Sequence, residues 1–114
     1  MKNYFNRLEF KCKCGQCDQD TVDYELLEIL NRLREWYESP ITINSGNRCE
    51  AYNKKIGGSK DSQHLRSRAA DIVVKGVNPS DVYALLNQWY PNQYGLGSYD
   101  TFTHVDPRSY RARW

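Results

Sequence analysis

The sequence predicts a single α+β domain in which a small, mainly antiparallel sheet is backed by helices. The chain has 114 residues, which is enough for one domain with a core and too few for two. Apolar side chains recur at three- and four-residue steps in residues 21–39, as in an amphipathic helix, whereas later segments alternate or cluster as strands do. The expected order is helix, strand, helix, strand, helix, strand, strand, and the last two strands form a hairpin.

The composition supports an ordered domain with a lean core. Hydrophobic residues make up 39% of the chain, nine residues are Tyr, and the net charge is only +2. These values argue against disorder, and so small a charge gives no indication of nucleic-acid binding. No apolar run is long enough to span a membrane, and the first seven residues lack the apolar run of a secretory signal. We therefore expect a protein made in the cytoplasm, without a membrane span.

The first part of the chain divides into a cysteine-containing segment and a helix. Residues 1–20 are expected to form a loop or a short extended piece. Asp20 or Thr21 can serve as the N-cap of the helix, and Pro40 ends it before a short strand over residues 41–43. The apolar face of the helix comprises Val22, Leu26, Ile29, Leu30, Leu33 and Trp36.

The remaining elements follow from breakers and apolar runs. Gly57-Gly58 ends a short helix, and Asn78-Pro79 supplies an N-cap and a proline at the first helical position. The tail, residues 109–114, alternates aromatic and arginine residues and is expected to pack its aromatic rings back onto the domain. The predicted bounds are 50–56 for the second helix, 57–63 for a polar loop, 69–74 for a buried strand, about 79–90 for the third helix, and 96–99 and 102–106 for the hairpin strands.

The two histidines are candidates for a metal site. His64 precedes Asp71 by seven residues across a loop-to-strand transition, and His104 lies on the last expected strand. Two imidazoles and a carboxylate supply the three N or O ligands of a catalytic zinc site, whose fourth position is left to water. A carboxylate in an apolar strand is costly to bury unless it is paired or bound to a metal. Asp71 is therefore either a metal ligand or the partner of Arg48 or Arg68.

Several short motifs occur along the chain in one order. They are Ser45-Gly46-Asn47-Arg48, Tyr52-Asn53, Gly57-Gly58, Ser62-Gln63-His64, Ala69-Ala70-Asp71-Ile72, Gly95-Leu96-Gly97-Ser98-Tyr99 and His104-Val105-Asp106-Pro107-Arg108. Over about residues 20–108, this order resembles the zinc D-alanyl-D-alanine peptidase family. The Hedgehog/DD-peptidase fold of that family is shared by bacterial carboxypeptidases and phage endolysins.

The resemblance implies roles for particular residues. Arg48 would grip a carboxylate or carbonyl oxygen of the substrate, a task that suits a guanidinium fork. Ser62 would orient its loop or donate to the substrate, and Tyr99, just before the hairpin turn, is a candidate for the wall of the groove. Ser67 stands where the family usually has glycine. The zinc ligands that the resemblance implies are His64, Asp71 and His104.

The general base departs from the family pattern, because the two positions that usually supply it hold a threonine and a phenylalanine. Asp106 projects to the same strand face as His104 and is expected to take a proton from water and return it to the leaving amine. It could instead anchor a metal ligand or pair with Arg108 or Arg48. Asp100, in the hairpin turn, is the other candidate base.

The resemblance implies a zinc peptidase that hydrolyses a D-Ala-containing peptide linkage of bacterial peptidoglycan, as a carboxypeptidase or an endopeptidase. A monomeric phage or prophage lytic enzyme, released to the cell wall or carried in a virion, fits the small size and the missing signal. A non-catalytic domain of the same fold, binding zinc or a ligand without turnover, is the alternative that the missing base favours. A cysteine-based metal module that binds nucleic acid is disfavoured by the low net charge.

The four cysteines leave three states open. Cys12, Cys14 and Cys17 give C-x-C-x-x-C, and Cys49 follows Arg48. Free thiols are the first expectation without a secretory signal, together with one disulfide that would tie Cys49 to the N-terminal segment. A structural four-cysteine zinc site comes second, because C-x-C is tighter than the usual spacing of zinc ligands.

Overall fold

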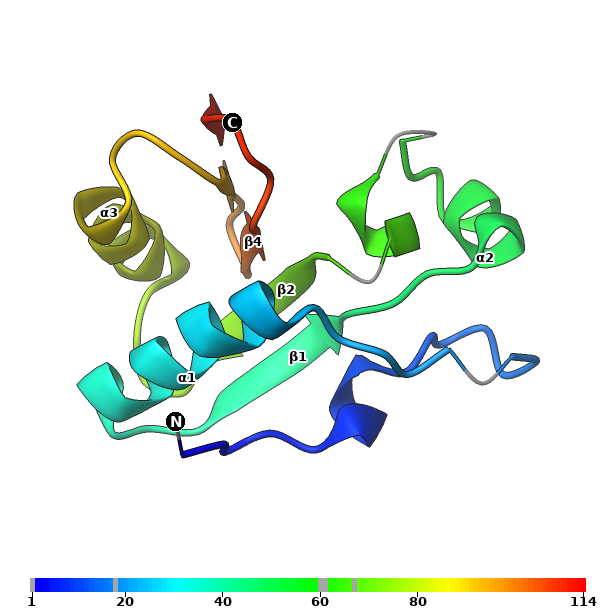
Figure 1. Ribbon diagram of the computed structural model, residues 1–114, viewed down its shortest axis with the longest axis horizontal. Coiled ribbons are helices and arrows are strands. Elements are labelled where there is room, and N and C mark those ends of the chain that lie inside the picture. Colours follow the sequence, from blue (N-terminus) through cyan, green and yellow to red (C-terminus); the bar gives the residue numbers. More distant parts are fainter. Residues whose placement is uncertain (1, 18, 60–61, 67) are drawn as a thin grey trace.

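The computed structural model describes residues 2–17, 19–59, 62–66 and 68–114, so Ser67 lies outside the described residues. Five strands form one sheet in the order β1-β2-β4-β3-β5, with helices packed beside it (Figure 1). This architecture confirms the predicted α+β class. The elements, with η for 3₁₀ helices, are η1 (Arg7–Phe10), α1 (Tyr24–Tyr37), β1 (Ile41–Ser45), α2 (Glu50–Lys55), η2 (Gln63–Arg66), β2 (Ala70–Val74), α3 (Pro79–Trp89), β3 (Gly95–Ser98), β4 (Thr103–Asp106) and β5 (Ala112–Arg113).

The strand pairing places the candidate ligands beside one another. β2 pairs antiparallel with β1 and β4, and Asp71 lies directly opposite His104 across the β2–β4 pair. β3 pairs antiparallel with β4, and β5 runs parallel to β3. Side chains alternate between the faces of a strand. Because Ile72 and Val105 belong to the hydrophobic core, Asp71 and His104 point to the opposite face of the sheet.

Helix α1 begins later than predicted. Its N-cap is Asp23, whose carboxylate accepts hydrogen bonds from the backbone N–H groups of Glu25 and Leu26. The preceding segment is committed elsewhere, because Val22 packs against the core and the carbonyl of Thr21 accepts a hydrogen bond from another loop. The prediction of Asp20 or Thr21 as N-cap is therefore wrong. The predicted apolar stripe is confirmed at its centre, where the buried side chains are Leu26, Ile29, Leu30 and Leu33.

Three short elements go beyond the sequence prediction. The N-terminal segment contains η1, which starts with a capping box between Asn6 and Glu9. The loop predicted over residues 57–63 leads into η2, which carries His64. The tail contains β5, where the guanidinium of Arg113 donates to the carbonyls of Tyr90 and Tyr94. The other predicted bounds differ from the observed ones by one or two residues.

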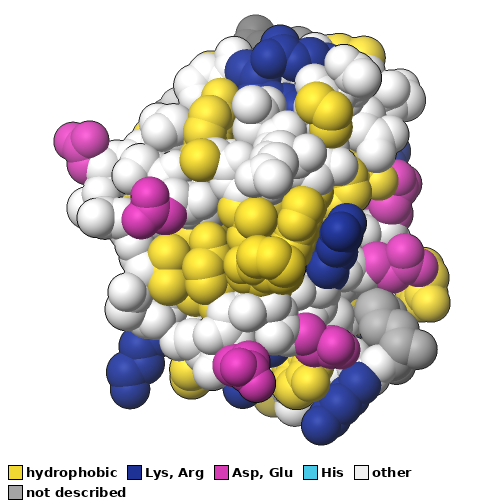
Figure 2. Space-filling view, turned by 90° about the vertical axis from the view of Figure 1, so that its left-hand side faces the viewer, with side chains coloured by type: hydrophobic (Ala, Val, Ile, Leu, Met, Phe, Trp, Pro, Cys, Tyr) yellow, Lys and Arg dark blue, Asp and Glu magenta, His cyan; other side chains and the backbone are white. Residues whose placement is uncertain are grey.

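The end of α1 and helix α3 adjoin through two tryptophans. Trp36 and Trp89 pack edge to face with ring centroids 5.6 Å apart, and the guanidinium of Arg32 lies 4.0 Å from the Trp89 ring. Trp36 is 62% exposed and therefore lies at the margin of the apolar stripe. Figure 2 views the molecule from the left-hand side of Figure 1 and shows hydrophobic side chains gathered in a patch on that face.

Within the described ranges, no helix combines the length and apolarity that a membrane crossing requires.

Candidate metal centre and substrate cleft

Three side chains converge on the sheet face opposite the core. β2 carries Asp71, β4 carries His104, and η2 carries His64. One ligand atom of each lies within 4.8 Å of the others, and the two imidazole rings are 5.2 Å apart. All three residues are at most 7% exposed. The sequence prediction required the strands of Asp71 and His104 to be neighbours, and they are.

Hydrogen bonds fix which nitrogen of each imidazole faces the centre. His64 Nδ1 lies 2.6 Å from the carbonyl oxygen of Gly46, which can only accept, so Nδ1 carries a proton and Nε2 faces Asp71. His104 Nε2 lies 2.7 Å from an oxygen of Asp106, and its Nδ1 lies 2.9 Å from Asp71 Oδ1. Metal-binding histidines are typically held by such bonds to their second nitrogen. The donor set therefore fits a cation such as Zn²⁺ between His64 Nε2, His104 Nδ1 and Asp71.

The electrostatics of the cluster favour a charge at its centre. Burial alone would raise the pKa of Asp71, but hydrogen bonds with His104 and His64 hold that pKa well below its ordinary value. Burial would likewise lower the pKa of His104, but hydrogen bonds to Asp106 and Asp71 raise it. Asp71 is thus a carboxylate, and its negative charge suits a bound cation at the centre of the cluster.

Arg48 lies beside the cluster and is paired with it. Its Nη2 donates to Asp71 Oδ2 at 3.2 Å, and its Nε and Nη1 donate to Ser45 Oγ and Asn53 Oδ1, both at 3.3 Å. Gly58 allows this arrangement, because a Cβ there would collide with the Asn53 amide and come within 3.2 Å of Arg48 Nη1. A guanidinium has five N–H donors, so two remain for a ligand. Arg48 is the arginine partner of Asp71 that the sequence left open.

Arg68, the other arginine considered for Asp71, is engaged elsewhere. Its guanidinium donates to the carbonyl of Pro107 at 2.8 Å and lies 3.4 Å from Asp23 and 3.9 Å from Glu25. It therefore ties the start of α1 to the end of β4, away from the candidate metal centre.

Asp106 is fully buried behind His104. It accepts hydrogen bonds from His104 Nε2 at 2.7 Å and from Arg108 Nε and Nη2 at 2.7 and 2.8 Å. Burial would raise its pKa, but the hydrogen bonds from His104 and Arg108 keep the pKa well below the ordinary value. These are the contacts of a carboxylate that orients a metal-binding imidazole. Its role as a base remains a prediction.

A cleft of about 730 Å³ opens over the candidate ligands. Ser62 and Tyr99 both line it, and Ser62 Oγ accepts a hydrogen bond from the backbone N–H of His64 at 3.2 Å. Neither Asp100 nor Asp106 is among the described residues that line the cleft. Besides the metal cluster, the lining comprises Arg48, Gly57, Gly58, Ser59, Ser62, Gln63, Tyr99, Phe102, Arg108, Tyr110 and Trp114.

The sequence reasoning missed Trp114 as a residue of the cleft. Its indole Nε1 donates to the hydroxyl of Tyr99 at 2.9 Å, and its ring centroid lies 5.0 Å from that of His104. Gly97 makes room for it, because a Cβ at that position would lie 2.6 Å from Trp114 Nε1. The alternation of aromatic and arginine residues in the tail is the strand pattern that could have indicated β5, and with it the position of Trp114.

The comparison with known families agrees with this geometry. No curated protein matches the chain. The family model described as Peptidase M15 matches residues 3–106, a range that contains the three candidate ligands, Arg48 and Asp106. Peptidases of this family depend on a metal, and the clustered donors of His64, Asp71 and His104 are suited to hold one. By the extent of this match, the chain belongs to the peptidase M15 family.

Proposed function

We propose that this chain is a zinc-dependent peptidoglycan hydrolase that cleaves a peptide bond in a D-Ala-containing stem peptide or cross-bridge of the bacterial cell wall. One observation carries the proposal. Two imidazole nitrogens and a carboxylate oxygen converge at a cleft, while the second nitrogen of each ring is already bonded to an acceptor. Three N or O donors beside an open cleft are the pattern of catalytic rather than structural zinc.

The residues around the cluster divide the work of hydrolysis. Zinc, when bound to His64, Asp71 and His104, supplies Lewis acidity and lowers the pKa of water. Arg48 offers its two remaining N–H donors to the carbonyl oxygen, where negative charge develops as the amide is attacked, or to a terminal carboxylate of the substrate. Ser62 keeps the backbone of His64 in place.

Proton transfer has two candidate carboxylates. Asp106 contacts His104 directly, which supports an orienting role through the imidazole. Asp100 is exposed in the connection between β3 and β4 and would have to approach the substrate from the rim. The base takes a proton from water and gives it to the departing amine, so exchanging either carboxylate for an amide distinguishes them.

The cleft walls support a peptide substrate with a negative charge. Arg48 and Arg108 line the cleft together with aromatic rings, among which Tyr99 and Phe102 stack at 4.4 Å. Guanidinium groups recognise carboxylates and aromatic faces cover apolar surface. We assign Tyr99 and Ser62 to substrate binding on this basis. We further propose a monomeric lytic enzyme of phage or prophage type that reaches the wall after release or within a virion.

A second candidate function rests on the lining of the same cleft. Among the described residues that line the cleft, Asp71 is the only one with a side-chain carboxylate, and Asp71 is itself a candidate metal ligand. A domain that holds zinc and recognises a cell-wall peptide without cleaving it would need no further carboxylate.

One experiment separates the two functions. Purified peptidoglycan is incubated with the zinc-loaded wild-type chain and with His64→Ala, and newly released amino groups and soluble peptides are measured. We expect the wild type to hydrolyse peptidoglycan and His64→Ala to do so at least about 10³-fold more slowly, because a catalytic metal stabilises the transition state by several kcal/mol. Binding of wall peptide without release of amines would establish the non-catalytic domain and overturn the proposed enzyme.

A further inference from the structure

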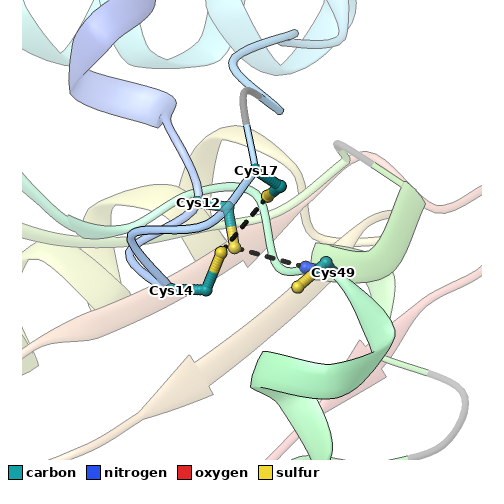
Figure 3. Close-up of side chains that lie close together, drawn as sticks. All are labelled: Cys12, Cys14, Cys17 and Cys49. Atoms are coloured by element: carbon teal, nitrogen blue, oxygen red, sulfur yellow. Dashed lines mark hydrogen bonds between the residues drawn. The ribbon is translucent and has the colours of Figure 1, made fainter.

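The four cysteines form a second cluster of metal-ligating atoms, separate from the cleft. Cys12, Cys14 and Cys17 come from the N-terminal segment, and Cys49 is the N-cap of α2. All four sulfurs lie within 4.8 Å of one another, and all four are free thiols (Figure 3). None of them lines the cleft.

We propose that these four cysteines bind a structural zinc ion that fastens the N-terminal segment to the loop carrying Arg48. Four thiolates in a compact group are the donor set of a closed, tetrahedral zinc site. With a zinc–sulfur bond of about 2.3 Å, the sulfurs of such a site lie about 3.8 Å apart. The Cys14 and Cys17 sulfurs are 3.3 Å apart and every other pair lies within 4.8 Å, so small shifts complete the tetrahedron.

The backbone around the sulfurs is arranged as in a thiolate site. The N–H of Gln16 points at Cys14 Sγ at 3.3 Å, the N–H of Cys49 at Cys12 Sγ at 3.4 Å, and the N–H of Tyr52 at Cys49 Sγ at 3.5 Å. Such donors stabilise negative sulfur. They come from both segments, so each segment is prepared for the shared ion.

The turn between Cys14 and Cys17 also suits the site. Gly15 has a φ of +76°, a conformation that glycine adopts without strain, and this turn brings the two sulfurs of the C-x-x-C pair together. The tight C-x-C spacing, which disfavoured a zinc site in the sequence, is therefore compatible with one in the structure. Cys14 and Cys17 have the usual C-x-x-C spacing, and the tight C-x-C step adds Cys12 to that pair.

Disulfides explain the arrangement less well than zinc does. A disulfide brings two sulfurs to about 2 Å and has no need of the remaining pair. Here each sulfur lies near all three others, which a single shared ion requires and two separate bonds do not.

The position of the cluster indicates its role. Asn47 donates from its backbone N–H to the carbonyl of Phe10 at 2.9 Å, so the N-terminal segment already lies against the loop before α2. Within that loop, Gly46 holds His64 through its carbonyl, Arg48 holds Asp71, and Cys49 belongs to the sulfur cluster. The proposed zinc would therefore anchor the loop that supports the cleft from behind.

The test is the metal content of the full chain, purified with zinc present and measured by mass spectrometry of the elements. The wild type is expected to hold zinc at both clusters, and Cys49→Ser to lose the share bound by sulfur while keeping the share bound at His64. Gln16→Ala, in the same turn, is the matched control and is expected to match the wild type, because its backbone donor to Cys14 remains. Unchanged zinc in Cys49→Ser would overturn the proposal.

Three further readouts complete the test. Cobalt substitution should give the sulfur-to-metal charge-transfer absorption of a thiolate site in the wild type and in His64→Ala, and should not in Cys49→Ser. A wild-type chain lighter by two hydrogens per disulfide, or iron in place of zinc, would overturn the proposal. If Cys49→Ser does not fold, the rate of thiol alkylation in the wild type decides. Thiols that react only after a chelator is added support the zinc site. Thiols that react equally fast before and after the chelator is added refute it.

The two proposals fail separately. Sulfur-bound zinc that survives in His64→Ala and disappears in Cys49→Ser supports the sulfur site even if the wild type hydrolyses nothing. Zinc that disappears completely in His64→Ala and stays at the wild-type amount in Cys49→Ser refutes the sulfur site and leaves the proposed peptidase intact.

Discussion

The two ligand clusters of this chain differ in donor type and in access. The cysteine cluster offers four sulfurs that lie within 4.8 Å of one another, and none of them lines the cleft. The cluster of His64, Asp71 and His104 offers three N or O donors at the base of a cleft of about 730 Å³. Closed sulfur sites stabilise structure, whereas three-donor sites with an open position support chemistry. Donor count and access together assign different work to the two clusters.

They also differ in how the fold assembles them. Asp71 and His104 face each other across paired strands, so the hydrogen-bonded sheet places them before any metal binds. The cysteines lie in a turn and at the start of α2, where few backbone hydrogen bonds join the two segments. We infer that the fold builds the cluster of His64, Asp71 and His104, whereas the sulfur cluster helps to build the fold. This difference can be tested from both sides.

The largest expected effect concerns the order of the N-terminal segment. In His64→Ala, where the proposed sulfur site is the zinc site that remains, a chelator should accelerate hydrogen exchange at the amides of Cys12 and Asn47, which bond to Gln19 and Phe10. When the free zinc concentration is 1,000 times the Kd of the site, bound zinc raises the free energy of local opening by about 4 kcal/mol, and the chelator should remove most of that amount. In Cys12→Ser the same chelator should change the exchange at Asn47 little. Equal responses of the two variants would show that the clusters do not differ in this way.

The next largest effect is expected at Arg48. Arg48→Lys keeps the charge but loses the fork that reaches Asp71, Ser45 and Asn53 together. We expect the turnover number to fall by about 10²-fold, as for the loss of one donor to a developing oxyanion, with both metals retained. The matched control is Arg68→Lys, which alters an arginine bound to Pro107 and Asp23 outside the cleft. A fall in Arg68→Lys as large as that in Arg48→Lys would indicate a general loss of structure.

The sequence predicted the parts of this molecule that depend on local periodicity. Each helix is determined by signals within its own segment. These signals are the apolar spacing of α1, the breakers around α2 and the proline at the start of α3. The motifs likewise indicated His64, Asp71 and His104 as one candidate set, and the antiparallel register that brings them together follows from the hairpin and its neighbouring strand.

The sequence could not decide among equivalent local choices or predict contacts made over long distances. Asp20, Thr21 and Asp23 can all cap a helix, and the packing of Val22 and the bond to Thr21 select Asp23. β5 pairs with β3 over only two residues, so the position of Trp114 depends on packing rather than on a long repeat. The meeting of residues 12–17 with Cys49 similarly requires the folding of the chain between them.

Asp106 provides a test of intermediate size. If Asp106 orients His104 through the 2.7 Å bond, Asp106→Asn should weaken zinc binding at the histidine cluster by about 10- to 100-fold and leave the sulfur-bound zinc in place. Titration with a chelating dye, read together with cobalt spectra, distinguishes the two sites. The matched control Asp100→Asn should bind zinc at both clusters as the wild type does.

The same pair of variants locates the general base. An Asp106→Asn enzyme that keeps its zinc but loses turnover would make Asp106 the base, against its buried contacts. Loss of turnover in Asp100→Asn with full zinc would assign the base to the hairpin connection. Turnover that recovers in Asp106→Asn when zinc is raised would support the orienting role.

The smallest effect is expected at the rim of the cleft. Trp114 donates to Tyr99 and lies against His104, so Trp114→Ala should remove an aromatic wall while all three candidate metal ligands remain in the chain. We expect KM to rise by about fivefold, the equivalent of about 1 kcal/mol of aromatic contact, with the turnover number retained. Trp36→Ala, an exposed tryptophan at the helix pair, is the matched control.

Gly97→Ala tests the same wall from beneath. The added methyl group would lie 2.6 Å from Trp114 Nε1, and Trp114 must then leave its place beside Tyr99. The expected rise in KM therefore equals that of Trp114→Ala, and the double variant should add little to either single change, because both act through one displaced ring. Additive effects would mean that Gly97 contributes to the cleft independently of Trp114, and an unchanged KM in both single variants would remove the tail from the substrate site.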